Sequence, residues 1–182
     1  MTHGRREALI LGAAGLAAAA AGFLVGPALL NSTTGGGEST AASIALRSAS
    51  LVDLAGQPRR LTEWRDRILV CNFWATWCAP CREEIPLLMA ARQKYGQKGV
   101  EIVGIAIDNV AKVGEFTASL KISYPILLAE ANGLDLMRQL GNSAGGLPYT
   151  VVAGRQGDLV HRKLGAFKDA ELDSILAPLT QG

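Results

Sequence analysis

Two cysteines, Cys78 and Cys81, stand three residues apart in the segment Trp77-Cys78-Ala79-Pro80-Cys81. Thiols at this spacing can meet as a disulfide across one helical turn, which makes the pair a redox couple. A thiol at a helix N-terminus faces unsatisfied N–H groups and the positive end of the helix dipole, and both stabilise the thiolate. We therefore expect Cys78, the outer thiol, to be the nucleophile and Cys81, one turn into the helix, to resolve the mixed disulfide.

The residues on either side of the cysteines predict a strand and a helix. Residues 68–74 are apolar and β-prone, as expected of a buried strand, and residues 83–95 have helical spacing. Pro80 lacks an N–H, which matters little in the first helical turn, and it fixes the backbone between the sulfurs. Ala79 and Pro80 thus set the spacing and stiffness of the motif.

Three other uses of the cysteine pair are disfavoured. A closed zinc site normally takes four ligands, and the only other candidates are Cys71, His3 and His161. Covalent haem attachment requires a histidine directly after the second cysteine, where this chain has Arg82. A purely structural disulfide across so short a loop would constrain the unfolded chain little. The redox interpretation is therefore preferred.

The sequence of residues 72–81, Asn-Phe-Trp-Ala-Thr-Trp-Cys-Ala-Pro-Cys, followed by Pro86, resembles thioredoxin-fold oxidoreductases. Within that class it is most similar to the membrane-anchored TlpA/ResA group. The resemblance runs from about Ser43 to the end of the chain. It implies a thiol:disulfide oxidoreductase in which the cysteine pair carries the electrons and no other cofactor is needed.

A second motif, Gly-Leu-Pro-Tyr-Thr at residues 146–150, supports this resemblance. In the family the proline of this motif is cis. The resemblance implies that Pro148 faces the cysteine pair and keeps metal ions off the thiols, while the backbone of Leu147 pairs with a bound substrate strand. Trp77 is expected to line the docking surface, and Trp74 to pack under the active-site loop.

Strand and helix signals alternate through the domain that we assign to residues 44–182. They predict an α/β, thioredoxin-like fold, with a central mixed sheet flanked by helices, an N-terminal hairpin and a central insertion at about 109–142. The expected elements are a hairpin at 51–57, a helical turn at 61–65, strands at 68–74, 100–107, 124–128, 150–153 and 159–164, and helices at 83–95, 113–120, 133–140 and 170–179.

Acid-base support for the thiols is expected from a nearby carboxylate. Thioredoxin has a buried aspartate at the strand position that Asn72 occupies here. The Asn72 amide cannot exchange a proton. Its side chain is expected to order the strand or a bound water, or to be a core amide whose hydrogen bonds are satisfied. Asp108 is our first candidate, because it follows a strand whose carboxyl end opens on the same edge as the cysteines; it is otherwise a helix cap. Glu84 is the second, although the helix dipole alone accounts for both Glu83 and Glu84. ResA-like relatives place a carboxylate in this region, with Asn109 a rival position.

The third cysteine, Cys71, stands two residues before Phe73 and therefore on the same face of the predicted strand. We expect a buried free thiol that acts as a small core residue. Pairing with another molecule is the alternative.

The N-terminus predicts an extracytoplasmic location. Arg5 and Arg6 precede an uncharged apolar stretch, residues 8–30, that is long enough to cross a bilayer. The positive-inside rule then places the N-terminus in the cytoplasm and the domain on the periplasmic side of the inner membrane. We expect residues 1–30 to be an uncleaved anchor; a cleaved signal peptide, with the arginine pair indicating a twin-arginine route, is the alternative. Residues 31–43 are rich in Gly, Ser, Thr and Ala, which predicts a flexible linker.

Charge and composition limit the kinds of molecule that the protein is expected to bind. The net charge is +2 without a large basic block, and aromatic residues make up 5% of the chain, so nucleic acid is not an expected partner. The resemblance implies protein disulfides as substrates, for example those of apocytochrome c or of cysteines awaiting copper. An extracytoplasmic reductase has no NADPH at hand, so a membrane electron donor similar to DsbD or CcdA is also implied.

We expect a reductase, but other functions stay open. DsbA-like oxidases carry a histidine beside the second cysteine, which stabilises the reduced form, whereas this chain has Ala79 and Pro80 between its thiols. A copper metallochaperone would need a further histidine or methionine, and His161 is the only histidine of the domain. A non-catalytic adaptor would tolerate Cys78→Ser, whereas both redox functions would be lost.

Overall fold

The computed structural model describes residues 34–129 and 132–181. The chain divides into two compact units, residues 1–38 and 39–182, and the second is the folded domain. Within the described ranges, no helix combines the length and apolar character needed to cross a membrane. The apolar stretch at residues 8–30 lies outside those ranges, so the predicted anchor stays a prediction.

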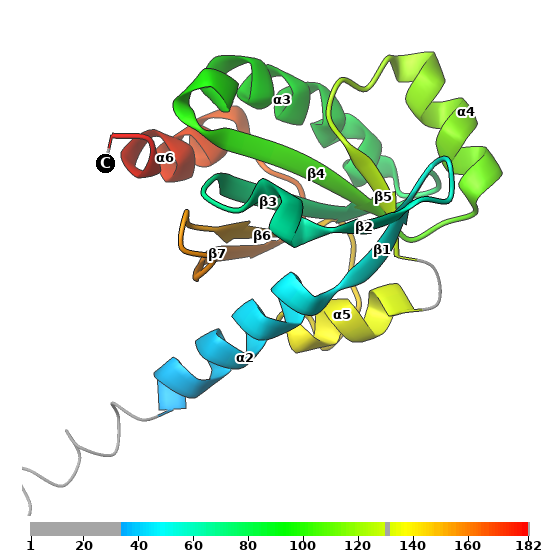
Figure 1. Cartoon of the computed structure of the whole chain (residues 1–182). Coiled ribbons are helices and arrows are strands. Elements are labelled where there is room, and N and C mark those ends of the chain that lie inside the picture. The colour runs from blue at the N-terminus through cyan, green and yellow to red at the C-terminus, as the bar shows by residue number, and fades with distance from the viewer. Residues whose placement is uncertain (1–33, 130–131, 182) are drawn as a thin grey trace, which may run out of the picture. The chain divides into compact units, whose positions relative to one another are not determined.

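One mixed sheet forms the centre of the domain. In the described part of the chain it has seven strands in the order β2-β1-β5-β4-β3-β6-β7 (Figure 1). β3, β4 and β5 run parallel, and the remaining neighbours pair antiparallel. The strands are β1 (Ser50–Asp53), β2 (Pro58–Arg60), β3 (Ile68–Trp74), β4 (Val100–Ala106), β5 (Ile126–Leu128), β6 (Tyr149–Ala153) and β7 (Leu159–Leu164).

Helices cover both faces of this sheet (Figure 1). The first face packs against α3 (Ala79–Tyr95), α4 (Val110–Leu120) and α6 (Asp169–Leu179). The second face packs against α2 (Thr34–Ser48), α5 (Gly133–Gln139) and the 3-10 turn η1 (Leu61–Trp64). A further 3-10 turn, η2 (Gly96–Lys98), links α3 to β4. The result is the expected α/β arrangement, and the thioredoxin-like fold is confirmed.

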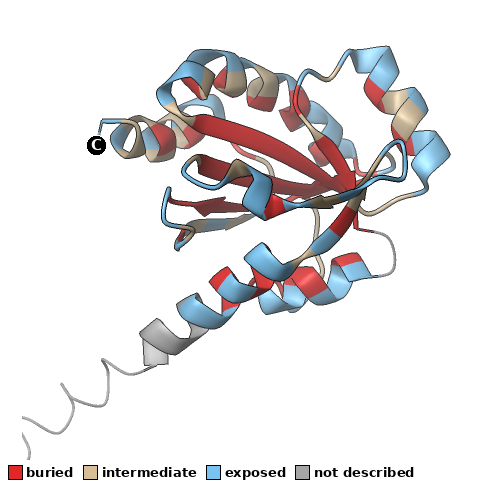
Figure 2. Cartoon of the chain, in the orientation of Figure 1, coloured by how far each residue is buried: buried red, intermediate tan, exposed pale blue. Residues whose placement is uncertain are grey.

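β3 lies between the two halves of the core. All its residues are buried, and Figure 2 shows the central strands of the sheet as buried. Its side chains alternate between the faces, as a strand requires. The first core takes Ile68, Val70 and Trp74, and the second takes Leu69, Cys71 and Phe73.

Capping residues mark the helix starts. α3 begins at Ala79, as expected from placing Cys78 at its N-terminus, although helical spacing is evident only from residue 83. α4 begins at Val110, where helical spacing predicted residue 113. Both helices are extended by the residue before them, because the side chains of Cys78 and Asn109 accept backbone N–H groups of the first turn. β5 is shorter than predicted and begins at Ile126, after Pro125.

The predicted flexible linker at residues 31–43 needs correction, since α2 is helical from Thr34. Ala42, Ser43, Ala45 and Leu46 are buried, and their spacing places them on one face of the helix. The three apolar members of this set belong to the core on the second face of the sheet. Packing against the sheet, rather than helix propensity, therefore orders this Gly- and Ser-rich segment.

Candidate active site

Cys78 and Cys81 meet at the start of α3 as a disulfide, with the two sulfurs 2.04 Å apart. Cys78 is the N-cap residue with an extended backbone, and its Sγ accepts the N–H of Cys81 at 3.3 Å. This is the helix-terminal environment that favours a thiolate. Cys78 is 6% exposed and Cys81 is fully buried. Cys78 is therefore the more accessible of the two sulfurs, and its role as the attacking thiol stays a prediction.

The residues around the disulfide form an exposed rim. The Trp77 side chain is 67% exposed, and Ala79 and Pro80 are also exposed. Trp74, in contrast, is fully buried, with its ring centroid 5.6 Å from that of Phe116. The two tryptophans thus take the separate positions that the sequence predicted, one at the surface and one beneath the loop.

The Leu147–Pro148 peptide bond is cis, as the resemblance implied. Pro148 is buried and comes directly before β6, in which Tyr149 pairs with Phe73 of β3. This pairing places the Leu147–Pro148 loop at the edge of the sheet from which the cysteine-bearing loop leaves β3. Leu147 is partly buried and packs against the cores on both faces.

Asp108 reaches the active-site loop, but it contacts the loop rather than the sulfurs. Its carboxylate accepts the backbone N–H of Thr76 at 3.0 Å, the Thr76 hydroxyl, and the backbone N–H of Asn109 at 2.7 Å. Burial opposes ionisation of Asp108, but hydrogen bonds from Thr76 and Asn109 outweigh it and lower the pKa of the carboxyl. An ionised Asp108 therefore holds the loop, while Asn109 caps α4 through bonds to Ala111 and Lys112.

Glu84 lies in a buried polar network that sequence reasoning only partly anticipated. Its side chain accepts the Nδ2–H of Asn72 at 2.7 Å and the backbone N–H of Phe167 at 3.0 Å. Asn72 also donates to the Thr150 hydroxyl at 2.9 Å. The network therefore joins β3, α3, β6 and the loop before α6. Sequence reasoning did not connect Thr150 or Phe167 with Glu84, because both are distant from it in the chain.

Burial raises the pKa of Glu84, although hydrogen bonds from Phe167 and Asn72 and the charge of Lys163 act against it. Glu84 is 2% exposed and stands three residues after Cys81, so the two side chains share the buried face of α3. The available signal was this spacing: Cys81, Glu84 and Ile85 repeat as a buried helix stripe. A carboxyl of raised pKa on the same helix face as the inner thiol is suited to proton transfer.

Further buried polar atoms surround this network. In the described residues, Asn72 Oδ1, Trp74 Nε1 and the Tyr124 hydroxyl have no hydrogen-bond partner. Burial, and to a lesser extent the charge of Glu84, raises the pKa of Tyr124. A Cβ at Gly104 would lie 2.8 Å from Ile126 Cδ1 and 3.0 Å from Trp74 Nε1, so these side chains would have to shift to admit one.

Cys71 and His161 both lie away from the disulfide chemistry. Cys71 is a free, fully buried thiol, and burial raises its pKa well above the usual range. His161 pairs with Val152 in the β6–β7 hairpin and lies near the Phe167 ring. The described part of the chain holds no cluster of three or more His, Cys, Asp or Glu residues that could bind a metal ion.

Comparison with known proteins agrees with this geometry. The Redoxin family profile matches residues 39–176. The thiol-disulfide oxidoreductase ResA of Bacillus cereus is 27% identical over 132 residues, which span 71% of this chain and 73% of that protein.

Solved structures give the same result. A thioredoxin-related protein from Neisseria meningitidis serogroup B is 32% identical, with a TM-score of 0.62, over 72% of this chain and 99% of that one. A thioredoxin-family thiol:disulfide interchange protein from Chlorobium tepidum TLS is 27% identical, with a TM-score of 0.62, over 72% of this chain and 92% of that one.

Proposed function

The chain belongs to the Redoxin family and is a thioredoxin-like thiol-disulfide oxidoreductase of the ResA type, and from this premise we propose that it reduces disulfides of protein partners outside the cytoplasm. The single observation that carries the proposal is the position of the two sulfurs. Cys78 caps α3 and is 6% exposed, and Cys81 lies fully buried one turn behind it. This arrangement separates an attacking thiol from a resolving thiol.

The reaction runs in two exchanges. The Cys78 thiolate attacks one sulfur of the substrate disulfide, forms a mixed disulfide and releases the other substrate sulfur as a thiolate that takes up a proton. The Cys81 thiolate then attacks the Cys78 sulfur, which closes the Cys78–Cys81 disulfide and releases the second substrate thiol. The substrate gains two electrons and two protons, and the enzyme ends in the oxidised state, the state that the structure holds.

Glu84 and Asp108 have different parts in this mechanism. Glu84 takes the proton of the buried Cys81 thiol before the second attack, because its carboxyl shares the buried helix face and has a raised pKa. Asp108 acts as a positioning residue, since its bonds to Thr76 fix the loop that leads into Cys78. Trp77 and the Leu147–Pro148 loop border the surface on which the substrate docks.

The residues between the two thiols favour reduction of the substrate over its oxidation. Ala79 and Pro80 place no positive charge beside the cysteines, so nothing in this segment favours the reduced form in the way that a strong oxidase requires. A reductase on the periplasmic side of the inner membrane must be re-reduced by an external dithiol. We assign that part to a membrane protein similar to DsbD or CcdA, with residues 1–30 as the anchor.

The substrates that fit best are protein disulfides that must be reduced to dithiols before a cofactor is inserted, as in apocytochrome c or a copper site. The test uses the reduced full-length chain and a peptide with an oxidised Cys-x-x-Cys-His sequence. We expect one peptide disulfide to be reduced for each Cys78–Cys81 disulfide formed, as measured by mass spectrometry. The same result is expected with Cys71→Ala as the matched cysteine control. An absence of transfer, with the peptide accessible to dithiothreitol, would contradict the proposal.

A further inference from the structure

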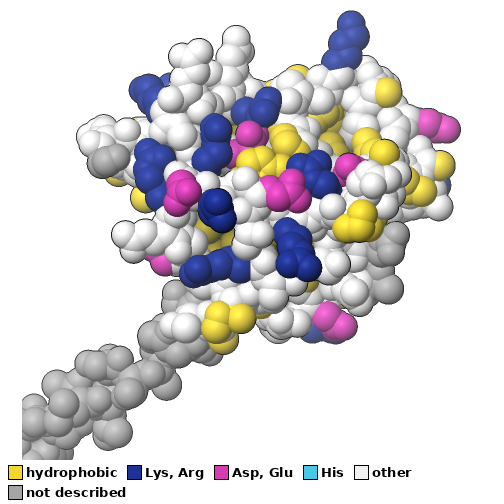
Figure 3. Space-filling view, viewed as in Figure 1, with side chains coloured by type: hydrophobic (Ala, Val, Ile, Leu, Met, Phe, Trp, Pro, Cys, Tyr) yellow, Lys and Arg dark blue, Asp and Glu magenta, His cyan; other side chains and the backbone are white. Residues whose placement is uncertain are grey.

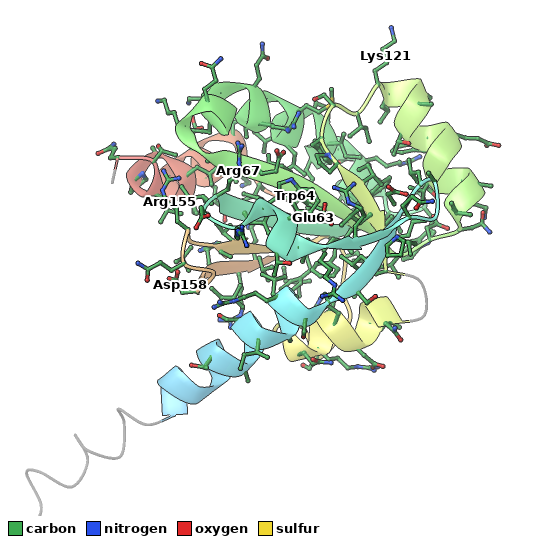
Figure 4. The ribbon with its side chains drawn as sticks, viewed as in Figure 1. Glu63, Trp64, Arg67, Lys121, Arg155 and Asp158 are labelled. Carbon is green, nitrogen blue, oxygen red and sulfur yellow. A yellow bond between two sulfur atoms is a disulfide. The ribbon has the colours of Figure 1, made fainter. Side chains whose placement is uncertain are left out.

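Four arginines line a small crevice at the edge of the sheet opposite the cysteines. The crevice has a volume of about 80 Å³ and lies between the end of α2, the η1 turn and the β6–β7 hairpin. Arg67 comes just before β3 and Cys78 follows that strand, so about 23 Å of strand separates them at ~3.3 Å per residue. Figure 4 shows Arg67, Arg155 and Trp64 on this side of the domain. The arginines are Arg47, Arg65, Arg67 and Arg155.

No carboxylate neutralises these arginines. The lining residues include no Asp or Glu, and none of the four takes part in an ion pair within the described ranges. Glu63 lies on the same side but pairs with Arg59 at 2.6 Å, and Asp158 borders a neighbouring groove. Several Lys and Arg side chains gather on the face that Figure 3 shows. The lining of the crevice therefore carries positive charge and no carboxylate of its own, although Asp and Glu side chains lie among the basic ones on this face.

Two of the guanidinium groups are fixed by backbone carbonyls. Arg67 Nη2 donates to the carbonyls of Gly96 and Val100, both at 2.8 Å, and Arg155 Nη2 donates to the carbonyl of Lys98 at 3.1 Å. These bonds leave other N–H donors of the same groups free. Arg67 Nε is buried and has no hydrogen-bond partner in the described residues. The bonds of Arg67 hold its guanidinium against residues of the groove along α3, which Arg67 also lines. Arg155 is held beside the crevice before a ligand arrives, which reduces the entropy lost on binding.

Two glycines make room for the arginines. A Cβ at Gly157 would lie 3.0 Å from Arg47 Nε, and one at Gly99 would lie 2.3 Å from Arg155 Nη1. Both glycines have φ in the left-handed region, at 80° and 90°. The left-handed backbone favours glycine at both positions, and the absence of a side chain there leaves space for the guanidinium groups.

The size of the crevice and the residues that line it limit the kinds of ligand that can bind there. The small volume of the crevice, about 80 Å³, suits one small anionic group rather than a large ligand. Leu46, Leu61, Leu69 and Trp64 supply an apolar wall. Carboxylate and phosphate both match the planar fork of guanidinium donors through paired hydrogen bonds. A phosphate group carries more charge and three acceptor oxygens, which suits a site lined by several arginines.

We propose that this crevice binds one phosphate group, supplied either by free phosphate or by the headgroup of an anionic phospholipid. The site is separate from the cysteine chemistry and does not depend on the direction of electron flow. If the phosphate belongs to a lipid, binding fixes the orientation of the domain at the membrane and leaves the cysteine edge facing away.

The experiment measures how fast phenylglyoxal, an arginine-specific reagent, labels each arginine of the full-length chain in lipid nanodiscs. One arm uses phosphatidylcholine discs with added inorganic phosphate, and the other uses discs containing phosphatidylglycerol without phosphate. We expect slower labelling of Arg47 and Arg155 in at least one arm, which also identifies the source of the phosphate. Arg138, an exposed residue paired with Asp135 on α5, is the internal control.

Variants separate binding from folding. We expect Arg155→Gln to raise the phosphate or phosphatidylglycerol concentration that half-protects Arg47 by about tenfold, because a hydrogen bond to a charged group is lost. Arg47→Gln, at an exposed residue, should weaken protection of Arg155 similarly, while Arg138→Gln should change nothing. Disulfide exchange should be unchanged in all three. The proposal is overturned if neither arm protects Arg47 and Arg155, or if Arg138 is protected equally.

Discussion

Cys71 and Cys78 are seven residues apart and have opposite environments. Cys71 lies in the middle of β3, fully buried among apolar side chains, where burial raises its pKa and keeps the thiol neutral. Cys78 caps α3, where its sulfur accepts a backbone N–H and is the more exposed of the disulfide pair. The same side chain is thus inert in a strand and reactive at a helix N-terminus. Position in the fold, rather than residue type, determines which thiol carries the chemistry.

The largest expected effect is that of Cys78→Ser. Without the outer sulfur no mixed disulfide forms, so reduction of the oxidised peptide should fall to the uncatalysed rate. The assay follows free thiols released over time. Retention of turnover in this variant would remove Cys78 from the mechanism.

Cys81→Ser should leave the first exchange intact and block the second. Because the resolving thiol is absent, the enzyme should accumulate as a mixed disulfide between Cys78 and the substrate. Non-reducing electrophoresis and mass spectrometry would detect this adduct. If the adduct forms through Cys71 instead, the contrast between the strand thiol and the helix thiol is wrong.

Glu84→Gln should lower the exchange rate by roughly a hundredfold, the low end of what acid-base catalysis contributes. The pKa of Glu84 is raised in the folded state, so the wild-type protein loses stability as the pH rises from the ordinary glutamate pKa through the folded value. The Glu84→Gln variant should not lose stability over this pH range, and its pH–rate profile should lack the ionisation that the wild type shows there. The exposed neighbour Glu83 provides the control: Glu83→Gln should keep the wild-type profile.

Asp108→Asn should destabilise the protein by about 1–2 kcal/mol at neutral pH, since charge-assisted bonds to Thr76 weaken. The pKa of Asp108 is lowered in the folded state, so its contribution is present above the ordinary aspartate pKa and disappears as the pH falls through the folded value. Urea unfolding at pH 7 and pH 3 checks this. A difference that persists undiminished at low pH would argue against an ionised Asp108.

Cys71→Ala should have the smallest effect. The sulfur fills space in the core and does no chemistry, so we expect a loss of about 1 kcal/mol in unfolding free energy. Exchange kinetics should match the wild type. A change in kinetics without a change in stability would mean that the strand thiol takes part.

The fold could be predicted largely from local patterns. The apolar run of β3, the cysteine motif after it and the Gly-Leu-Pro sequence each determine structure within a few residues, and these parts were found where expected. α2 was missed because its Gly- and Ser-rich sequence has little helix propensity, and its order comes from the packing of residues such as Leu46.

The site was less accessible to sequence reasoning wherever it depends on distant contacts. From the sequence, the helix dipole alone could account for Glu84. Its hydrogen-bond partners on β3 and before α6 could not be foreseen, because they are not neighbours in the chain. Asp108 was placed on the correct edge by the parallel pairing of β3 and β4, but its bond to Thr76 requires the folded loop. The arginine crevice assembles from separate segments and gave no sequence signal.

The reduction potential of the Cys78–Cys81 couple tests the central claim most directly. The full-length protein would be equilibrated in glutathione or dithiothreitol buffers, and the oxidised fraction measured by thiol alkylation and mass spectrometry. A reductase predicts a value near that of thioredoxin, about −270 mV or modestly above. A value approaching about −120 mV would instead identify a disulfide-donating oxidase and contradict the proposed direction of electron flow.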